Sequence, residues 1–134
     1  MKSQIAALKV LKRYVSVTFL LKSLENRNES VTFAASMRII SFAALRDFTA
    51  THADAVEPLK EWYKAVTKAY WRNFADMKQT FNSVDYVGND RYVFNIKGNN
   101  YRIVAIVLFV NQKVYIRFVG THEEYNRIKD IKNI

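Results

Sequence analysis

Three strand-like segments near the C-terminus, joined by very short connections, most constrain how this chain can fold. "RYVFNI" (91–96), "YRIVAIVLFV" (101–110) and "KVYIRFVG" (113–120) are rich in Val, Ile, Tyr and Phe, which favour strands. Only "KGNN" and "NQ" separate them, and both are turn-like. Because parallel neighbours need a long crossover, these connections predict an antiparallel three-stranded meander.

The segment before this meander shows helical periodicity instead. After a short β-branched run, "MRIIS", which is a plausible strand, Ser41 is a predicted N-cap for a helix in "FAALRDFTATH". A second helix is predicted to begin near Asp54, with Pro58 in its first turn. Its apolar face comprises Val56, Leu59, Trp62 or Tyr63, and Val66. A third, short helix is predicted over residues 73–81.

The order of these elements predicts the fold class. After the meander, "THEEYNRIKDIKNI" is predicted to leave the sheet as a short helix capped by Thr121. We therefore expect an α+β fold in which a twisted antiparallel sheet has two or three N-terminal helices packed on one face and a short C-terminal helix.

The charge and composition limit the function. The chain carries 21 Lys+Arg against 12 Asp+Glu, a net charge of +9 that favours a polyanionic partner, although a basic domain without such a partner is the alternative. It has no cysteine, and its two histidines, His52 and His122, lack metal-site spacing, so no metal or other cofactor is expected. No apolar run approaches the roughly 20 residues that span a bilayer. The absence of cysteine fits a reducing compartment, and a cytoplasmic location is expected.

Two arginines on adjacent predicted strands are candidate anion ligands. Strict alternation places Arg102 with Val104 and Ile106 on one face of its strand. It places Arg117 with Tyr115 and Val119, on the side that Arg102 could share, and it places Phe118 with Val114 and Ile116 on the opposite side. A phosphate bridging Arg102 and Arg117 is one interpretation, and a separate surface salt bridge for each is the other.

Further candidates follow the last strand or lie on other polar segments. His122 could transfer protons near neutral pH, and Tyr125 lies one helical turn further on, where it could stack on a base or simply pack. Lys97 and Asn99 lie in the "KGNN" turn, where polar residues are expected anyway. The second helix carries a lysine row that is either solvated or follows a phosphate backbone: Lys60, Lys64 and Lys68.

The motifs that are missing exclude several enzyme classes. There is no Walker loop, no GxGxxG and no pair of carboxylates at a strand end, so an ATPase, a dehydrogenase or a glycosidase lacks its machinery. Cleavage of RNA without a metal needs less, because the 2′-hydroxyl is itself the nucleophile. Cations for the phosphate oxygens and groups that transfer protons suffice. The arginines, the histidine and the tyrosine form such a set.

Four motifs resemble one known family. "MRIISFAALRDF", "PLKEWYKAV", "FNIKGNNYRIV" and "IRFVGTHEEYNRI", between Met37 and about Ile128, resemble the HigB toxins of type II toxin–antitoxin modules. The resemblance implies a RelE-like fold and an mRNA interferase, an endoribonuclease that cleaves messages on translating ribosomes. It also implies a partner, a helix-turn-helix antitoxin of the HigA type.

The resemblance also implies roles for individual residues. Arg102, in "YR", matches the RelE-like arginine that contacts the scissile phosphate. Val93 and Asn95 stand where RelE has lysines, so lysine-based chemistry is not expected here. His122 stands where RelE has an arginine, and Tyr125 lies near the place of the late RelE tyrosine.

The resulting hypothesis assigns each residue a role in cleavage. Arg102 and Arg117 stabilise the phosphorane charge, His122 is the acid or base, and Tyr125 orients or stacks. Two alternatives stay open at this point: a non-catalytic RNA- or ribosome-binding module, and a decayed toxin that is kept to bind the antitoxin.

Residues 1–36 differ from the remainder of the chain. HigB-like toxins open with "M-[RH]-[IL]-I", which "MRII" at Met37 resembles. We therefore expect residues 1–36 to be a poorly ordered N-terminal extension, consistent with a misassigned start codon, and residues 37–134 to be the toxin domain. The basic start and short apolar run weakly resemble a secretory signal, but Lys22, Glu25 and Arg27 interrupt it.

Overall fold

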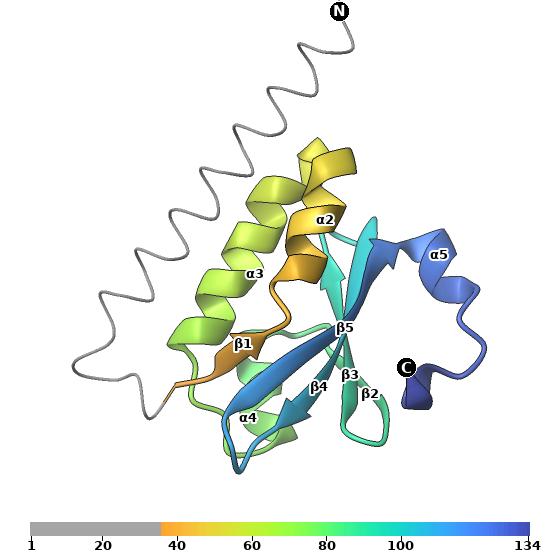
Figure 1. The fold of residues 1–134 in the computed structure, drawn as a ribbon. Coiled ribbons are helices and arrows are strands. Elements are labelled where there is room, and N and C mark those ends of the chain that lie inside the picture. The colour runs from red at the N-terminus through yellow and green to blue at the C-terminus, as the bar shows by residue number, and fades with distance from the viewer. Residues whose placement is uncertain (1–35) are drawn as a thin grey trace, which may run out of the picture.

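The computed structural model describes residues 36–134, which arrange helices against a five-stranded sheet (Figure 1). The predicted extension, apart from Ser36, lies outside the described residues. In chain order the elements are β1 (Arg38–Ile40), α2 (Ala43–Thr51), the 3₁₀ helix η1 (Ala53–Ala55), α3 (Val56–Lys68), α4 (Phe74–Thr80), β2 (Asp85–Gly88), β3 (Arg91–Ile96), β4 (Tyr101–Leu108), β5 (Lys113–Thr121), α5 (His122–Asn126) and the 3₁₀ helix η2 (Ile131–Asn133). None of these helices is long and apolar enough to cross a membrane.

The strands are ordered β1-β5-β4-β3-β2 in the sheet. β2 to β5 form an antiparallel meander, which confirms the predicted pairing of the three long strands. β1 pairs in parallel with β5, with Arg38 opposite Lys113. This parallel pairing is possible because the helices and the first strands of the meander supply a long crossover between β1 and β5. The sheet is therefore mixed, and the predicted antiparallel strands form most of it.

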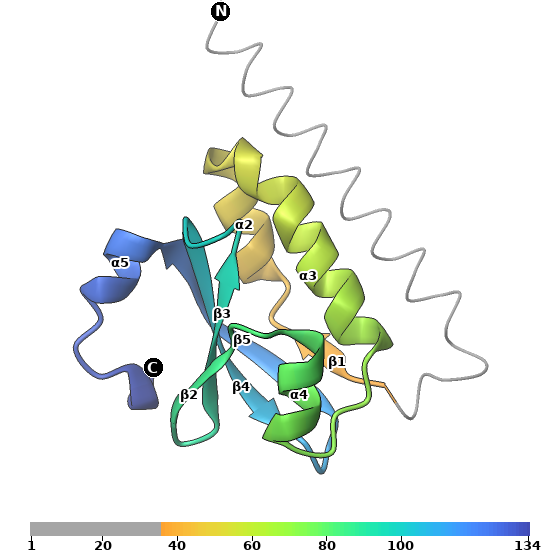
Figure 2. The ribbon, with the colours of Figure 1, turned by 180° about the vertical axis from the view of Figure 1, so that it is seen from behind.

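The helices α2, α3 and α4 cover one face of this sheet, as predicted (Figure 2). α3 buries the face that its periodicity predicted: Val56, Leu59, Trp62, Tyr63 and Val66. Pro58 lies in its first turn, where the missing N–H costs no intrahelical hydrogen bond. Phe94 of β3 joins the two layers, because its ring lies edge-on to Trp62 at 5.4 Å and to Phe81 at 5.3 Å between centroids. Aromatic packing thus fixes the helices to the sheet.

Some boundaries differ from the sequence-based expectation. Ser41 is not the N-cap of α2: it has a φ of 72°, and no side chain caps that helix. The strand β2 was not predicted; it pairs with β3 through a turn in which Asn89 and Asp90 have φ values of 48° and 63°. β4 ends at Leu108, two residues before the predicted end, because residues 109–112 form the turn to β5.

The short C-terminal helix, α5, begins directly at the end of β5. The Thr121 hydroxyl accepts from the Glu124 backbone N–H at 3.1 Å, and Glu124 Oε1 accepts from the Thr121 N–H at 3.0 Å. This capping box confirms the predicted cap. Beyond α5 the chain returns to the sheet, where Arg91 Nη2 donates to the backbone oxygen of Ile134 at 2.7 Å. α5 therefore lies on the other side of the sheet from α3 (Figure 1).

Candidate functional site

A β-bulge in β5 decides which side chains share the sheet face opposite the helices. β4 and β5 pair Arg102 with Gly120, and their register shifts at Arg117, which has no partner on β4. Beyond this extra residue, Phe118 lies on the face of Arg102, whereas Val119 packs against the core on the helix side. Strict alternation predicted the reverse for Phe118 and Val119, so that prediction is wrong.

Arg102 is the centre of the group of residues that meets on this face. Its Nη2 donates to Asn99 Oδ1 at 3.2 Å, and its guanidinium carbon lies 4.5 Å from the centroid of the Tyr125 ring. Its Nε is buried and has no hydrogen-bond partner among the described residues. A stacked guanidinium with unused N–H donors suits a phosphate or a base edge. Three of the predicted site residues are thus in contact.

Phe118 extends the aromatic surface beside Tyr125, with 6.5 Å between the two ring centroids. Gly120 makes room for it, because a Cβ at this position would lie 2.4 Å from Phe118 Cζ. The guanidinium of Arg102 and the two rings together offer faces on which nucleobases stack. Sequence reasoning missed Phe118, since its face depends on the bulge and alternation alone gives the wrong side.

His122 is the first residue of α5 and is fixed at both its backbone and its ring. Its backbone N–H donates to the Asn100 carbonyl at 3.1 Å, and its Nδ1 lies 3.0 Å from Asn126 Nδ2. This contact is a hydrogen bond from the Asn126 amide when Nδ1 is unprotonated. The imidazole makes no hydrogen bond to Arg102 within residues 36–134. No cluster of three or more His, Cys, Asp or Glu in this range is placed to hold a metal ion.

Arg117 is exposed, and within the described part of the chain its side chain makes no hydrogen bond or ion pair. Arg102 pairs with Gly120, which is three residues from Arg117, or about 10 Å along the strand at about 3.3 Å per residue. The register therefore does not set the two arginines opposite one another. The role of Arg117 stays a prediction.

Lys97 lies in the same turn as Asn99, but its side chain bonds to a residue of the helix layer. Lys97 Nζ donates to Asp54 Oδ2 at 2.8 Å, and the Tyr101 hydroxyl donates to the same carboxylate at 2.7 Å. The hydrogen bonds from Lys97 and from Tyr101 lower the pKa of Asp54, and the carboxylate in turn raises the pKa of Tyr101 to about 12. Sequence reasoning singled out neither Asp54 nor Tyr101 for the site, because no motif joins residues so far apart.

The predicted lysine row lies apart from this group of residues. Lys60, Lys64 and Lys68 belong to α3, in the helix layer (Figure 1). Arg102 lies on the opposite face of the sheet from the core residues of its strand. Lys60 Nζ is 3.9 Å from Glu57 Oε2, a weak and partly exposed ion pair. The turn residues that are predicted to bind RNA, Lys97 and Asn99, therefore do not form one continuous surface with the lysine row. The role of the lysine row stays a prediction.

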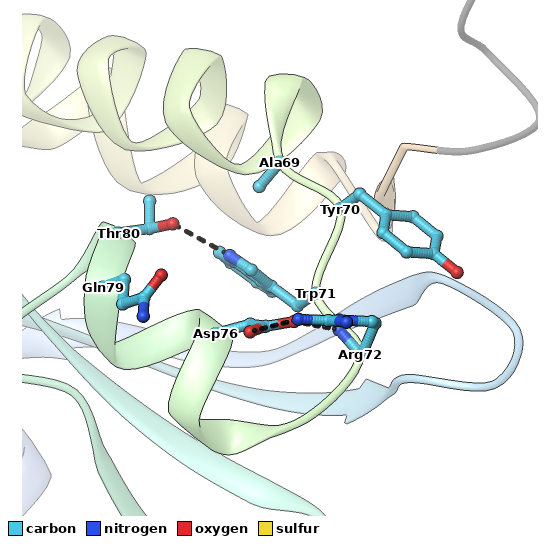
Figure 3. Close-up of a pocket in the computed structure, with 7 residues that line it drawn as sticks. All are labelled: Ala69, Tyr70, Trp71, Arg72, Asp76, Gln79 and Thr80. Atoms are coloured by element: carbon cyan, nitrogen blue, oxygen red, sulfur yellow. Dashed lines mark hydrogen bonds and ion pairs between the residues drawn. The ribbon is translucent and has the colours of Figure 1, made fainter.

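A shallow hollow of about 500 Å³ lies at the connection between α3 and α4 (Figure 3). It is lined by Ala69, Tyr70, Trp71, Arg72, Asp76, Gln79 and Thr80. Four of its polar side chains pair with one another: Trp71 Nε1 donates to Thr80 Oγ1 at 2.9 Å, and Arg72 Nε donates to Asp76 Oδ2 at 3.0 Å. Gln112, in the turn after β4, donates to the Trp71 carbonyl at 2.6 Å, so the hollow lies at the far end of β4 from the predicted site.

Known proteins match most of the described residues. Residues 55–128 match the HigB toxin family, described as the RelE-like toxic component of a toxin-antitoxin system. The chain is 37% identical over 93 residues to the "mRNA interferase toxin HigB" of Escherichia coli strain K12, which covers 67% of this chain and 88% of that protein. It is equally similar to the "mRNA interferase HigB" of Escherichia coli O157:H7. It is 26% identical over 94 residues to the "mRNA interferase HigB" of Escherichia coli O6:H1, covering 69% of this chain and 91% of that protein.

The matched segment includes α3, the whole antiparallel meander and α5, and therefore both Arg102 and Tyr125. The family predicted from the four motifs is confirmed. The chain belongs to the HigB family, the RelE-like toxic components of toxin–antitoxin systems.

Proposed function

We propose that this protein is an mRNA interferase, a metal-independent endoribonuclease that cleaves messages in the cytoplasm on the translating ribosome. The observation that carries this proposal is the Arg102 guanidinium, which stacks on Tyr125 at 4.5 Å and donates from Nη2 to Asn99 in the adjoining turn. Family membership supports the same activity, since relatives 37% identical to this chain are named mRNA interferases.

In the proposed reaction the 2′-hydroxyl oxygen attacks the adjacent phosphorus while the bond from phosphorus to the 5′-oxygen breaks. A base removes the 2′-hydroxyl proton and an acid protonates the 5′-oxygen, which leaves a 2′,3′-cyclic phosphate and a 5′-hydroxyl. Arg102 and Arg117 stabilise the charge on the non-bridging oxygens. His122 acts as the acid or base: as an imidazolium it donates a proton to the leaving oxygen, and as a neutral imidazole it accepts one from the 2′-hydroxyl.

The message is bound by stacking and by contacts to phosphates. Tyr125 stacks on a base next to the scissile phosphate, with Phe118 beside it. Asn99 and Lys97, in the adjoining turn, contact the RNA backbone. Because the lysine row lies on the other face of the sheet, we assign it to phosphates away from the scissile one, through Lys60, Lys64 and Lys68.

The protein partner in this proposal is a helix-turn-helix antitoxin of the HigA type. A toxic component needs an inhibitor in its host, and the family description places it in a toxin–antitoxin system. A neighbouring reading frame that encodes a helix-turn-helix protein, and a stable complex of the two purified proteins, would support this partner. Failure of that protein to bind the toxin or to restore growth would contradict it.

The proposed toxin domain is residues 37–134, with residues 1–36 as an N-terminal extension. The family match over residues 55–128 lies entirely within this domain. Intact-mass measurement of the protein made from its native gene tests the boundary. A mass that includes residues 1–36 would contradict the idea of a misassigned start codon.

The test of the activity uses purified protein and a message under translation. We expect Arg102→Ala to lower the cleavage rate about 10²–10³-fold through lost charge stabilisation, and His122→Ala about 10²–10⁴-fold through lost proton transfer. Arg46→Ala, which removes an exposed arginine paired with Asp47 on α2, is the matched control and should cleave like the wild type. RNA binding without cleavage by the wild type would instead support the non-catalytic binding module.

A further inference from the structure

Asp54, in η1 between α2 and α3, is an acidic residue outside the proposed site that bonds to the turn beside it. Both of its carboxylate oxygens lie 2.7 Å from the Tyr101 hydroxyl, and Oδ2 also accepts from Lys97 Nζ at 2.8 Å. Tyr101 is only 8% exposed, whereas the Asp54 carboxylate that accepts its hydrogen bond is about half exposed. The ion pair with Lys97 is about half exposed on both sides and contributes less.

The two donors stand at the two ends of one turn, residues 97–100, which joins β3 to β4. Lys97 is the first residue of the turn and has a φ of 52°, a conformation that is unfavourable for any residue with a Cβ. Tyr101, the first residue of β4, follows the turn directly. Asp54 therefore fixes both ends of the turn to the helix layer and offsets the strain at Lys97.

The same turn contacts two residues of the proposed site on the other side of the sheet. Asn99 Oδ1 accepts from Arg102 Nη2 at 3.2 Å, and the Asn100 carbonyl accepts from the His122 backbone N–H at 3.1 Å. A displacement of the turn would therefore move the guanidinium and the start of α5 together.

We propose that Asp54 is a positioning residue for RNA cleavage: through Tyr101 and Lys97 it holds the turn at residues 97–100 in the place that aligns Arg102 and His122. This inference rests on the proposed function. It gives Lys97 a structural role in addition to any contact with RNA. Asp54 itself touches neither the message nor the reacting atoms.

Tyr101→Phe is the sharpest variant, because it removes only the hydroxyl and keeps the ring edge-on to Phe48 at 5.3 Å. We expect kcat for cleavage to fall about tenfold to a hundredfold, the loss that a displacement of about 1 Å causes, while KM stays near its wild-type value. Asp54→Ala, which also removes the ion pair with Lys97, should lower kcat at least as much. The double variant should be no slower than Asp54→Ala alone, because Tyr101 then has no carboxylate left to lose.

Two matched controls isolate this contact. Tyr86→Phe removes the hydroxyl of an exposed tyrosine on β2, and Asp47→Asn removes the charge of an exposed carboxylate on α2. Both should keep the wild-type kcat. Each variant is assayed well below its own melting temperature, so that loss of folded protein does not lower the rate. Asp54→Glu, which retains the carboxylate, should recover part of the rate that Asp54→Ala loses.

A second readout does not depend on activity. In Tyr101→Phe, hydrogen exchange at the His122 amide, which donates to Asn100, should become faster than in the wild type. Unchanged exchange together with unchanged kcat would overturn the positioning role while leaving the nuclease proposal intact. A wild-type protein that cleaves no RNA would overturn the proposed function. The exchange measurement would then decide by itself whether Asp54 fixes the turn.

Discussion

The guanidinium carbon of Arg102, on β4, lies 4.5 Å from the centroid of the Tyr125 ring, on α5. Two local features make this contact possible. The capping box of Thr121 and Glu124 starts α5 at the last residue of β5, and Arg102 pairs with Gly120 just before it. A strand cation and a helix aromatic side chain therefore meet where β4 begins and β5 ends, and this pair is the centre of the proposed RNA site.

Replacing Tyr125 tests whether its ring or its hydroxyl matters. Tyr125→Ala should weaken binding of an uncleavable 2′-deoxy substrate by about 1–3 kcal/mol, the contribution of one stacked base. Tyr125→Phe should bind like the wild type, because the ring that faces Arg102 is retained. Fluorescence anisotropy gives both dissociation constants. Equal losses in the two variants would instead implicate the hydroxyl.

Gly120→Ala tests the position of Phe118. The added methyl would lie 2.4 Å from Phe118 Cζ, so the ring must move. Overpacking of this kind costs about 1–3 kcal/mol in the free energy of unfolding, which urea denaturation measures. Phe118→Leu combined with Gly120→Ala should recover part of the loss.

Gly98→Ala is the matched control for this experiment. A Cβ at Gly98 meets nothing within 4 Å, and the cost there comes from a φ of 64°. Phe118→Leu should therefore not relieve it. If Phe118→Leu also failed to recover the unfolding free energy that Gly120→Ala loses, the Phe118 ring would not be the group that excludes a side chain from position 120.

Most of the fold could be predicted because it is encoded by short-range patterns. The meander follows from three β-prone runs with turns too short for a crossover, and the buried face of α3 follows from helical spacing. β2 was missed because it has only four residues, and its turn depends on Asn89 and Asp90 accepting positive φ. Asn-Asp is a less common pair at the two central positions of such a turn than Asn-Gly or Asp-Gly.

The site could be predicted only in part. Arg102, Asn99 and Tyr125 lie close to short-range signals, namely the turn and the helix cap, and the structure brings them together. The bulge at Arg117 is a single extra residue, and an alternating sequence does not reveal it. It therefore reversed the predicted faces of the residues that follow. Phe118 became visible as a site residue only through the pairing of β4 with β5.

The α5 cap predicts how stability responds to acid. The hydrogen bond from the Thr121 backbone, followed by that from its side chain, lowers the pKa of Glu124 below its ordinary value of 4.5. The pKa of Glu124 is therefore lower in the folded state than in the unfolded state. The stabilisation that its carboxylate provides is present above the unfolded-state pKa and is lost as the pH falls through the folded-state pKa. The difference in unfolding free energy between the wild type and Glu124→Gln should therefore be smaller at pH 3 than at pH 7. Equal differences at the two pH values would contradict this role for the carboxylate.

The Tyr101 hydroxyl predicts an opposite response in alkali. Its hydrogen bond to Asp54 raises the pKa of Tyr101 from 10.0 to about 12. Because the folded-state pKa is the higher one, the stabilisation is fully present below pH 10 and is lost as the pH rises towards 12. Denaturant unfolding of the wild type and Tyr101→Phe across this range should show the wild type losing stability faster. Tyr86→Phe, which removes an exposed hydroxyl, is the control, and its unfolding free energy should change with pH as that of the wild type does. If the unfolding free energy of Tyr101→Phe also changed in parallel with that of the wild type, the Tyr101 hydroxyl would not bond to the Asp54 carboxylate in solution.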